Sequence, residues 1–441
     1  MHPAPDWIIG SAESDLTPDR SVFLYGYPHA QRMSSGIHDR LLSSAIYLSD
    51  NTSAAIFVAN DIIWVPRNIV QNARQRISRN TGVPAGHIMI TASHTHSGPV
   101  VSRMLSNQAD PYVPDPDPQY LTQLEDAIVA AATNACKSAR PATLSIGSTS
   151  IAGLGTNRHD PSGAMIESLP VLIARDRNDD RPLAIMCVCA MHPTVLHEDW
   201  TQISGDFPGL AREHLSHDSL DCPLVYHMGP AGDQSPRHVV RGNTIEEADR
   251  LGRLLADKIR TAIDNSTPIP AGAIRCQSAS TRLPLRELPP IKAAWEAEIA
   301  ARVTLDRLRT SGAPAAQIRT AECDLFGAEE TVTLAQAAAE GTLAAAAEQC
   351  LPAEVQAITI GHHTWIGWPG EVFVDFALQI LRDFNNVSII SLANGELQGY
   401  LVTEAAVAAR TYESGNALFQ SPDSGQILVD VTRKLLAGTH P

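Results

Sequence analysis

The chain has 441 residues, of which 44% are hydrophobic and 18% are charged, as in ordinary globular enzymes. Its length predicts two domains or one large elaborated domain. The 48 acidic residues outnumber the 33 basic ones and give a formal net charge of −15, which disfavours nucleic acid as a partner.

Neither a long apolar run nor a signal-peptide pattern occurs, so we expect no stable membrane insertion. The seven cysteines are odd in number and contain no C-x-x-C pair. Cys187 and Cys189 alternate in an apolar segment and are interpreted as buried small side chains. A reducing, cytoplasmic location is therefore predicted. The oligomeric state is left open.

The predicted elements alternate between strands and helices in chain order. Strands are expected over 43–50 and 53–61, paired around a turn at Asp50-Asn51. An amphipathic helix is expected to start at Ile69 and to end at Gly82, a typical residue after a helix end. A long helix over 119–139 and strands over 142–151, 182–192 and 223–229 follow. This alternation predicts an α/β fold with a central mixed sheet flanked by helices, possibly layered α/β/β/α.

Residues 286–352 have a different composition, rich in Ala, Glu and Gln. Strong helix formers fill 291–312 and 329–350, which predicts a helical hairpin inserted in the domain. Because site motifs lie on both sides of it, we expect this insertion over or beside the mouth of the site. The strand pattern resumes at Val355.

The segment ITASHTHSGP places two histidines, His94 and His96, directly after an apolar run. In an extended backbone, residues i and i+2 point to the same side, so both rings can enter one cavity. They can serve as metal ligands, or as a ligand and an acid–base partner. The alternative is a pair of loop histidines bonded to nearby carbonyl groups.

Three other apolar segments also lead into polar side chains that can bind a metal. His192 follows an apolar strand, Glu371 is expected in the first turn of a helix, and Tyr400 follows another short strand. A carboxylate in a first helical turn is stabilised in its ionised form by the helix dipole. Histidine and carboxylate ligands with an open position are typical of catalytic zinc. Each residue alone also fits a structural role: a loop histidine, a helix-start charge and a core tyrosine.

Several segments, in this order, resemble the neutral/alkaline non-lysosomal ceramidase family. The segments are GSAESDLTP, GIHDRLLSSAIYL, FVANDI, TASHTHSGP, MHPTVL, GPAGDQSP, WPGEVF and LANGELQGYLVT. The resemblance covers nearly the whole chain apart from the insertion. It implies a single catalytic domain over 1–441 and a zinc amidase whose ligands are His94, His192, Glu371 and Tyr400.

The resemblance also implies roles around the metal. His96 matches a non-ligating histidine near the scissile carbonyl, and Arg158 matches an arginine that lines the substrate site. Ser235 matches a family serine proposed to be catalytic. We interpret Ser235 as structural, because no base histidine is evident beside it. Tyr412 matches a tyrosine near the substrate head group.

Two departures from the family bear on the substrate. Val407 stands where the family has a tyrosine, and the chain ends before the family's C-terminal Ig-like domain. We therefore expect hydrolysis of the linear N-acyl bond of a small soluble amide, rather than of membrane ceramide, by zinc-activated water. The alternatives are a zinc-dependent esterase, lactonase or phosphoesterase, and a non-catalytic metal-binding protein.

Overall fold

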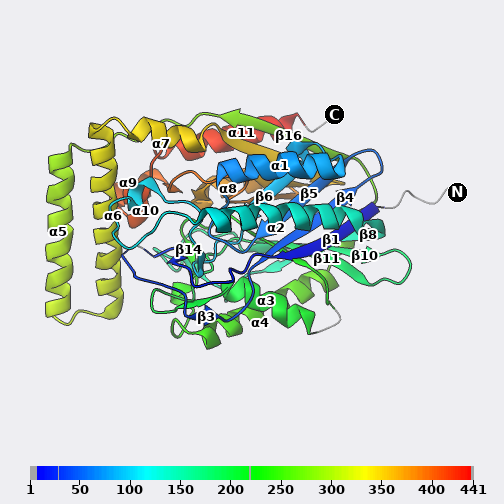
Figure 1. Cartoon of the computed structure of the whole chain (residues 1–441), viewed down its shortest axis with the longest axis horizontal. Coiled ribbons are helices and arrows are strands. Elements are labelled where there is room, and N and C mark those ends of the chain that lie inside the picture. Colours follow the sequence, from blue (N-terminus) through cyan, green and yellow to red (C-terminus); the bar gives the residue numbers. More distant parts are fainter. Residues whose placement is uncertain (1–6, 28, 218–219, 439–441) are drawn as a thin grey trace.

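Two β-sheets packed face to face form the centre of the molecule, and helices cover both outer faces (Figure 1). The computed structural model describes residues 7–27, 29–217 and 220–438. The predicted mixed α/β fold is confirmed, including its layered α/β/β/α arrangement.

The larger sheet has nine strands and mixes parallel with antiparallel pairs. In spatial order its strands are β13 (Leu224–Met228), β11 (Pro182–Cys189), β10 (Ser168–Asp176), β8 (Arg140–Ser150), β1 (Trp7–Asp15), β4 (Leu42–Ser49), β5 (Ala54–Asn60) and β6 (Ile88–Ala92), with β15 (Thr267–Pro268) beside β8. Only β5–β6 and β11–β13 are parallel; every other pair is antiparallel.

The smaller sheet and four short strand pairs complete the β structure. The smaller sheet is β16 (Ile274–Thr281), β17 (Ala353–Ile360), β18 (His363–Gly367) and β20 (Val387–Ile390). The short pairs are β2 (Leu24–Tyr25) with β7 (Gly98–Pro99), β3 (Gly36–Ile37) with β12 (Gln202–Ile203), β9 (Thr156–Asn157) with β14 (Gln234–Ser235), and β19 (Glu371–Val372) with β21 (Tyr400–Leu401).

The helices divide among the outer faces and the insertion. They are α1 (Arg67–Thr81), α2 (Pro118–Lys137), α3 (Asp206–Ser216), α4 (Ile245–Asp264), α5 (Ile291–Thr310), α6 (Ala315–Ala339), α7 (Leu343–Cys350), α8 (Val374–Asp383), α9 (Glu404–Ala409), α10 (Tyr412–Asn416) and α11 (Asp423–Ala437). Short 3-10 turns lie at η1 (Ala85–His87), η2 (Leu105–Asn107) and η3 (Pro236–His238). None of the described helices is long and apolar enough to cross a membrane.

Alternation of apolar side chains along the strands creates the layers. In β11, Ile185 and Cys187 pack under α3 and α4, whereas Met186 and Val188 face the second sheet. The same alternation in β5 sends Val58 toward α1 and α2 and Phe57 toward Trp365 of β18. Successive side chains of a strand point to opposite faces, so both faces of this sheet are buried.

The two edges of the large sheet approach each other, which matters for the site. Thr91 in β6 and His227 in β13 lie at opposite ends of the strand order, yet Oγ1 of Thr91 is 2.7 Å from Nδ1 of His227. The chain segments that follow β6, β11 and β13 therefore emerge close together.

The insertion is helical and forms three helices rather than two. Helices α5 and α6 pack against each other and stand at one end of the molecule (Figure 1). Helix α6 starts at Ala315, well before the predicted 329, and Gly341, with φ of 76°, separates it from α7. Helix α5 exposes an apolar stripe at i, i+4 and i+8: Trp295, Ile299 and Val303.

Other local predictions agree with the structure. Helix α1 ends at Gly82, whose φ of 76° lies in the left-handed region, and β4 pairs antiparallel with β5. Cys187 and Cys189 are buried and unbridged. Strand β10 and helices α3 and α4 are absent from the sequence prediction and are additions from the structure.

Candidate metal centre and active site

His94 lies two residues beyond the end of β6 and enters the site through a turn. Its φ of 72° is in the left-handed region, so the predicted extended backbone from His94 to His96 is wrong. The turn is held by the backbone N–H of His94, which donates to Ile62 O at 2.9 Å. The ring Nδ1 lies 2.7 Å from Ile63 O, which leaves Nε2 directed into the site.

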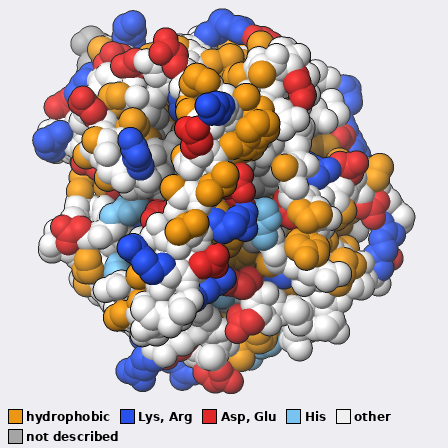
Figure 2. Space-filling model, turned by 90° about the vertical axis from the view of Figure 1, so that its left-hand side faces the viewer, with side chains coloured by type: hydrophobic (Ala, Val, Ile, Leu, Met, Phe, Trp, Pro, Cys, Tyr) orange, Lys and Arg blue, Asp and Glu red, His pale blue; other side chains and the backbone are white. Residues whose placement is uncertain are grey.

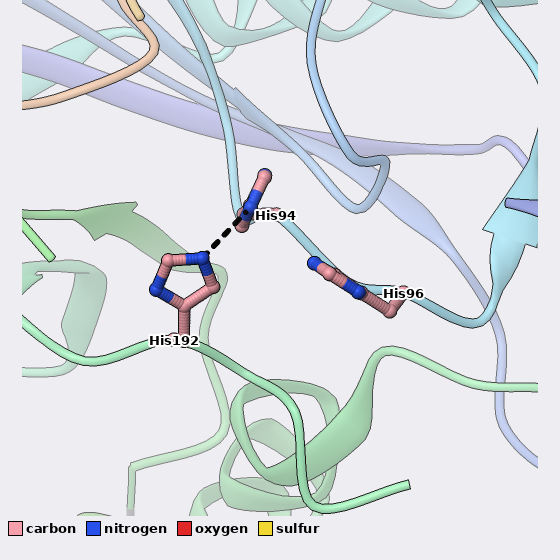
Figure 3. A group of neighbouring side chains, drawn as sticks. All are labelled: His94, His96 and His192. Carbon is pink, nitrogen blue, oxygen red and sulfur yellow. Dashed lines mark hydrogen bonds between the residues drawn. The ribbon is translucent and has the colours of Figure 1, made fainter. Parts of the chain in front are cut away.

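His192 is presented in the same way from the other edge of the sheet. It follows β11, and its Nδ1 lies 2.6 Å from Ala231 O. Because a carbonyl oxygen only accepts, Nδ1 carries the proton in both His94 and His192, and each Nε2 presents a lone pair. The two Nε2 atoms are 3.1 Å apart (Figure 3).

Glu371 completes this cluster. Its Oε2 lies 3.1 Å from Nε2 of His192 and 3.2 Å from Nε2 of His94. Glu371 sits in the short strand β19, and helix α8 begins only at Val374, so the predicted placement in a first helical turn is wrong. Burial raises the pKa of Glu371, but the charge of His94 and His192 in their protonated forms outweighs it and brings the pKa well below its usual value.

The geometry of these three atoms fits a tetrahedral metal ion. Two lone pairs and a carboxylate oxygen separated by 3.1–3.2 Å repel one another unless positive charge lies among them. Metal–nitrogen bonds of about 2.0–2.1 Å in a tetrahedron put neighbouring ligand atoms about 3.3 Å apart. A second set, His94, His96 and His192, also brings its ligand atoms within 4.8 Å of one another. His94 and His192 are common to both sets.

His96 differs from the other two histidines in its contacts. Both of its ring nitrogens are buried and make no hydrogen bond, whereas its ring lies 4.9 Å from that of His94 (Figure 3). Burial and the neighbouring His94 and His192 lower the pKa of His96 well below its ordinary value, so the ring is neutral. A Cβ at Gly26 would lie 2.5 Å from the His96 ring, and Gly26 has φ of 130°, so only glycine fits there.

Tyr400 lies beside Glu371, since the two residues are partners in the parallel pair β19–β21. Burial and Glu371 raise the pKa of Tyr400 well above its ordinary value, so the phenol keeps its proton. The Arg158 guanidinium lies 5.3 Å from the centre of the Tyr400 ring. The four residues predicted as ligands are therefore neighbours in the fold.

Arg158 is already paired within the protein. Its Nη2 lies 2.6 Å from Oε1 of Glu413 and also donates to Gly232 O. Burial raises the pKa of Glu413, but Arg158 and His159 lower it to about 2, so the pair is ionic. Sequence reasoning missed Glu413, although it directly follows the predicted site residue Tyr412.

Ser235 lies in a loop that connects parts of the site. Its Oγ accepts from Arg237 N–H at 3.4 Å at the start of η3, and none of the described hydrogen bonds joins it to a histidine. In the same loop, Asp233 accepts from Val374 N–H at 3.0 Å and from Asn157 Nδ2 at 2.8 Å. The loop thus ties the start of α8 to the segment that carries Arg158.

A small pocket of about 40 Å³ opens beside the cluster. One wall holds His94, His96, Glu371 and Tyr400; Tyr412, whose ring centre lies 6.1 Å from that of Tyr400, is also in the lining. The rest of the lining includes residues that the sequence analysis missed: Tyr25, Tyr27, Asn107, Glu330 and Asn416. These residues lack a motif, and only folding brings them to the pocket. Val407 is exposed on α9 and is absent from this lining.

The fold and this cluster define a layered α/β protein with a buried site that can hold a metal ion. Residues 7–222 match the profile described as neutral/alkaline non-lysosomal ceramidase, N-terminal. Among solved structures, neutral ceramidase from Pseudomonas aeruginosa aligns with a TM-score of 0.76 at 19% identity, over 99% of this chain and 75% of that one. A ceramidase complexed with C2 aligns with a TM-score of 0.74 at 18% identity, over 98% and 76%.

A neutral ceramidase from Oryza sativa subsp. japonica is 28% identical over 100 residues. That match spans 22% of this chain and only 13% of the relative. The predicted resemblance is therefore confirmed: residues 7–222 match the model of the neutral/alkaline non-lysosomal ceramidase family, and the fold is shared with neutral ceramidase along nearly the whole chain.

Proposed function

We propose that the protein is a zinc-dependent hydrolase that cleaves the linear N-acyl bond of a small polar amide. One observation carries the proposal: Nε2 of His94, Nε2 of His192 and Oε2 of Glu371 meet within 3.2 Å, with a pocket beside them. The match of residues 7–222 to a ceramidase family model supports hydrolysis of an amide.

In this proposal His94, His192 and Glu371 hold zinc, and Tyr400 is the fourth ligand. Zinc bound there supplies a Lewis acid and lowers the pKa of its bound water to about 7. The carboxylate of Glu371 offsets part of the cation's charge in a buried site, which neutral imidazoles do not do. This favours Glu371 over His96 as the third ligand.

The neutral ring of His96 suits proton transfer. Because both of its nitrogens are free of other bonds, one can accept a proton while the other donates to the carbonyl oxygen or the departing amine. Such a role is typically worth about 10²–10⁴-fold in rate. Tyr400 keeps its phenolic proton without metal, so a Tyr400 phenol displaced from the metal by the substrate can donate to the same carbonyl oxygen.

The surroundings of the pocket support a small polar substrate over a long-chain lipid. The pocket is small, and six charged side chains line the outer cleft next to it. Leu305, Leu325 and Phe326 also line this cleft, but a long acyl chain that filled it would bury the charged groups against hydrocarbon, which is costly.

Turnover measurements test the proposal. Short N-acyl amides, matched esters, a phosphate ester and long-chain ceramide in detergent are compared by kcat/KM, before and after removal of metal by a chelator. We expect the short amides to have the highest kcat/KM. Chelation should abolish activity, and added zinc should restore it. Ester or phosphate ester turnover without amide turnover would contradict the proposal, as would a tenfold or larger preference for ceramide, which corresponds to about 1.4 kcal/mol.

A further inference from the structure

Helix α6 of the insertion delivers a buried carboxyl group to the catalytic pocket. Glu330 is 3% exposed and lines the pocket together with His94, His96 and Glu371. It is the insertion's contribution to a pocket otherwise built by the core of the fold. A carboxyl group in such a place faces whatever enters the pocket.

Glu330 is held by hydrogen-bond donors and lacks an ionic partner. Its Oε1 accepts from Asn107 Nδ2 at 2.8 Å and its Oε2 from Asn416 Nδ2 at 2.9 Å. The Tyr25 hydroxyl donates to Asn107 Oδ1 at 2.7 Å, which fixes that amide with its NH₂ toward Glu330. None of the ion pairs found among the described residues involves Glu330, although each of its oxygens has a lone pair to spare.

Arg158, the basic group beside Tyr400, already has an acidic partner inside the protein. Arg158 forms an ion pair with Glu413 and is absent from the pocket lining. The resemblance implied that Arg158 lines the substrate site; its described contacts are with Glu413, Gly232 O and the Tyr400 ring. Charge recognition in the pocket falls to Glu330, which favours donors and cations and repels carboxylates.

The cleft next to the pocket combines charged with apolar side chains. An outer cleft of about 490 Å³ lies along α5 and α6 and shares Tyr27 with the inner pocket. Its charged side chains are paired: Arg302–Glu329 at 2.7 Å, Arg309–Glu322 at 2.8 Å and Arg319–Glu198 at 2.8 Å. Basic and acidic side chains are intermixed on this end of the molecule, around a hollow near its centre (Figure 2).

We propose that Glu330 recognises a hydrogen-bond-donating group of the substrate, an ammonium or a hydroxyl, so that the enzyme selects amides bearing such a group over acidic ones. The inference rests on the proposed amide hydrolysis. An ammonium supplies the counter-charge that the buried carboxyl lacks, and a hydroxyl supplies a neutral donor. Burial raises the pKa of Glu330 to about 7, in keeping with a carboxyl that has no cation beside it.

The test uses N-acyl amides of nearly equal size that end in ammonium, hydroxyl, methyl or carboxylate, with the end group on the amine side in one series and on the acyl side in another. In the wild-type protein we expect kcat/KM for the ammonium or hydroxyl substrate to exceed that for the carboxylate by at least about tenfold in one series. This preference requires no variant.

The variant Glu330→Gln then tests whether Glu330 causes this preference for ammonium or hydroxyl substrates. We expect KM for the preferred substrate to rise about tenfold or more, with kcat, zinc content and turnover of the methyl substrate changed less than about twofold. Glu340→Gln, an exposed position at the end of the same helix, is the matched control and should change nothing.

Three results are distinguishable. If the wild type turns over amides without preferring donors, or if Glu330→Gln leaves the preference intact, the inference is wrong while the proposed function stands. If no amide of any end group is hydrolysed, the proposed function itself fails. Persistent turnover of the methyl substrate by Glu330→Gln shows that the variant is folded.

Discussion

His94 and His192 are buried, and their hydrogen bonds to the backbone orient both rings so that each can bind a cation. Each Nδ1 is tied to a backbone carbonyl, Ile63 O or Ala231 O, so the proton is kept away from the site. Burial lowers the pKa of His192, which keeps its Nε2 lone pair available near neutral pH. The backbone thus selects the tautomer that a metal requires.

Substitution of the three histidines separates metal binding from chemistry. We expect His94→Ala and His192→Ala each to lose bound zinc, because each removes one of the converging Nε2 atoms. His96→Ala should keep zinc and lose turnover by about 10²-fold or more, since its nitrogens make no hydrogen bond and are available for proton transfer. Zinc content by elemental analysis and turnover of a short amide measure the two effects.

Glu371→Gln is the companion variant for this prediction. It removes the carboxylate while keeping the shape of the side chain, so we expect zinc affinity to fall sharply. Retention of zinc in Glu371→Gln together with its loss in His96→Ala would show that the three histidines, and not Glu371, form the ligand set.

Among the elements, α5 is the least integrated helix. Only Ala294 and Leu305 of α5 are buried, and Leu305 packs with Ala321 and Leu325 of α6 in a small cluster separate from the main cores. Helix α5 is therefore held mainly by α6. Its position along the outer cleft makes its attachment relevant to substrate entry.

Leu305→Ala is expected to loosen α5 without unfolding the domain. Loss of a buried leucine costs about 2 kcal/mol or more. Because the lost contacts lie between α5 and α6, amide hydrogen exchange in α5 should accelerate by at least about tenfold, while β4 and β5 stay protected. Val303→Ala, on the same helix but 62% exposed, is the control and should leave exchange unchanged. If Leu305→Ala accelerated amide hydrogen exchange in the sheets as much as in α5, the prediction that α5 loosens separately from the domain would be wrong.

At the scale of the whole molecule, buried carboxyl groups couple stability to pH. Burial raises the pKa of Glu396 from 4.5 to about 7. Between these two values the folded state binds more protons than the unfolded state, so this group makes stability fall as pH rises from about 4.5 to 7. Other groups titrate in the same range, so its effect is measured as a difference between variants.

Glu396→Gln should remove the contribution of Glu396 to the pH dependence of the unfolding free energy. The difference in unfolding free energy between Glu396→Gln and the wild type is expected to shift by about 3 kcal/mol in favour of the variant from pH 4.5 to 7.5. Equilibrium unfolding in urea at several pH values measures it. Glu404→Gln, at an exposed position in α9, should show a constant difference. A constant difference for Glu396→Gln as well would mean that Glu396 ionises in the fold as easily as in the unfolded chain.

Local chemistry made much of the architecture predictable from sequence. The apolar alternation of β4 and β5, the glycine that ends α1 and the helix formers of the insertion act over a few residues, so they are legible without the fold. The proximity of His94, His192, Glu371 and Tyr400 was predictable because each lies in a segment that resembles the family, and their role as zinc ligands stays a prediction. The error at Glu371 arose because Val372 and Phe373 still lie between Glu371 and the start of α8 at Val374.

The way these residues come together depends on long-range packing and could not be predicted from the sequence. The bond between Thr91 and His227 shows two distant sheet edges brought together, and no local pattern encodes that closure. The pairing of Arg158 with Glu413 and the arrival of Glu330 in the pocket join segments 86 or more residues apart, as the Asn416–Glu330 bond illustrates. The donor types and most of their local elements could be predicted from short stretches of sequence, because they depend on short-range forces. Long-range packing of two sheets and an inserted helix determined which donors share one buried volume, and therefore which charges are free to act on a substrate.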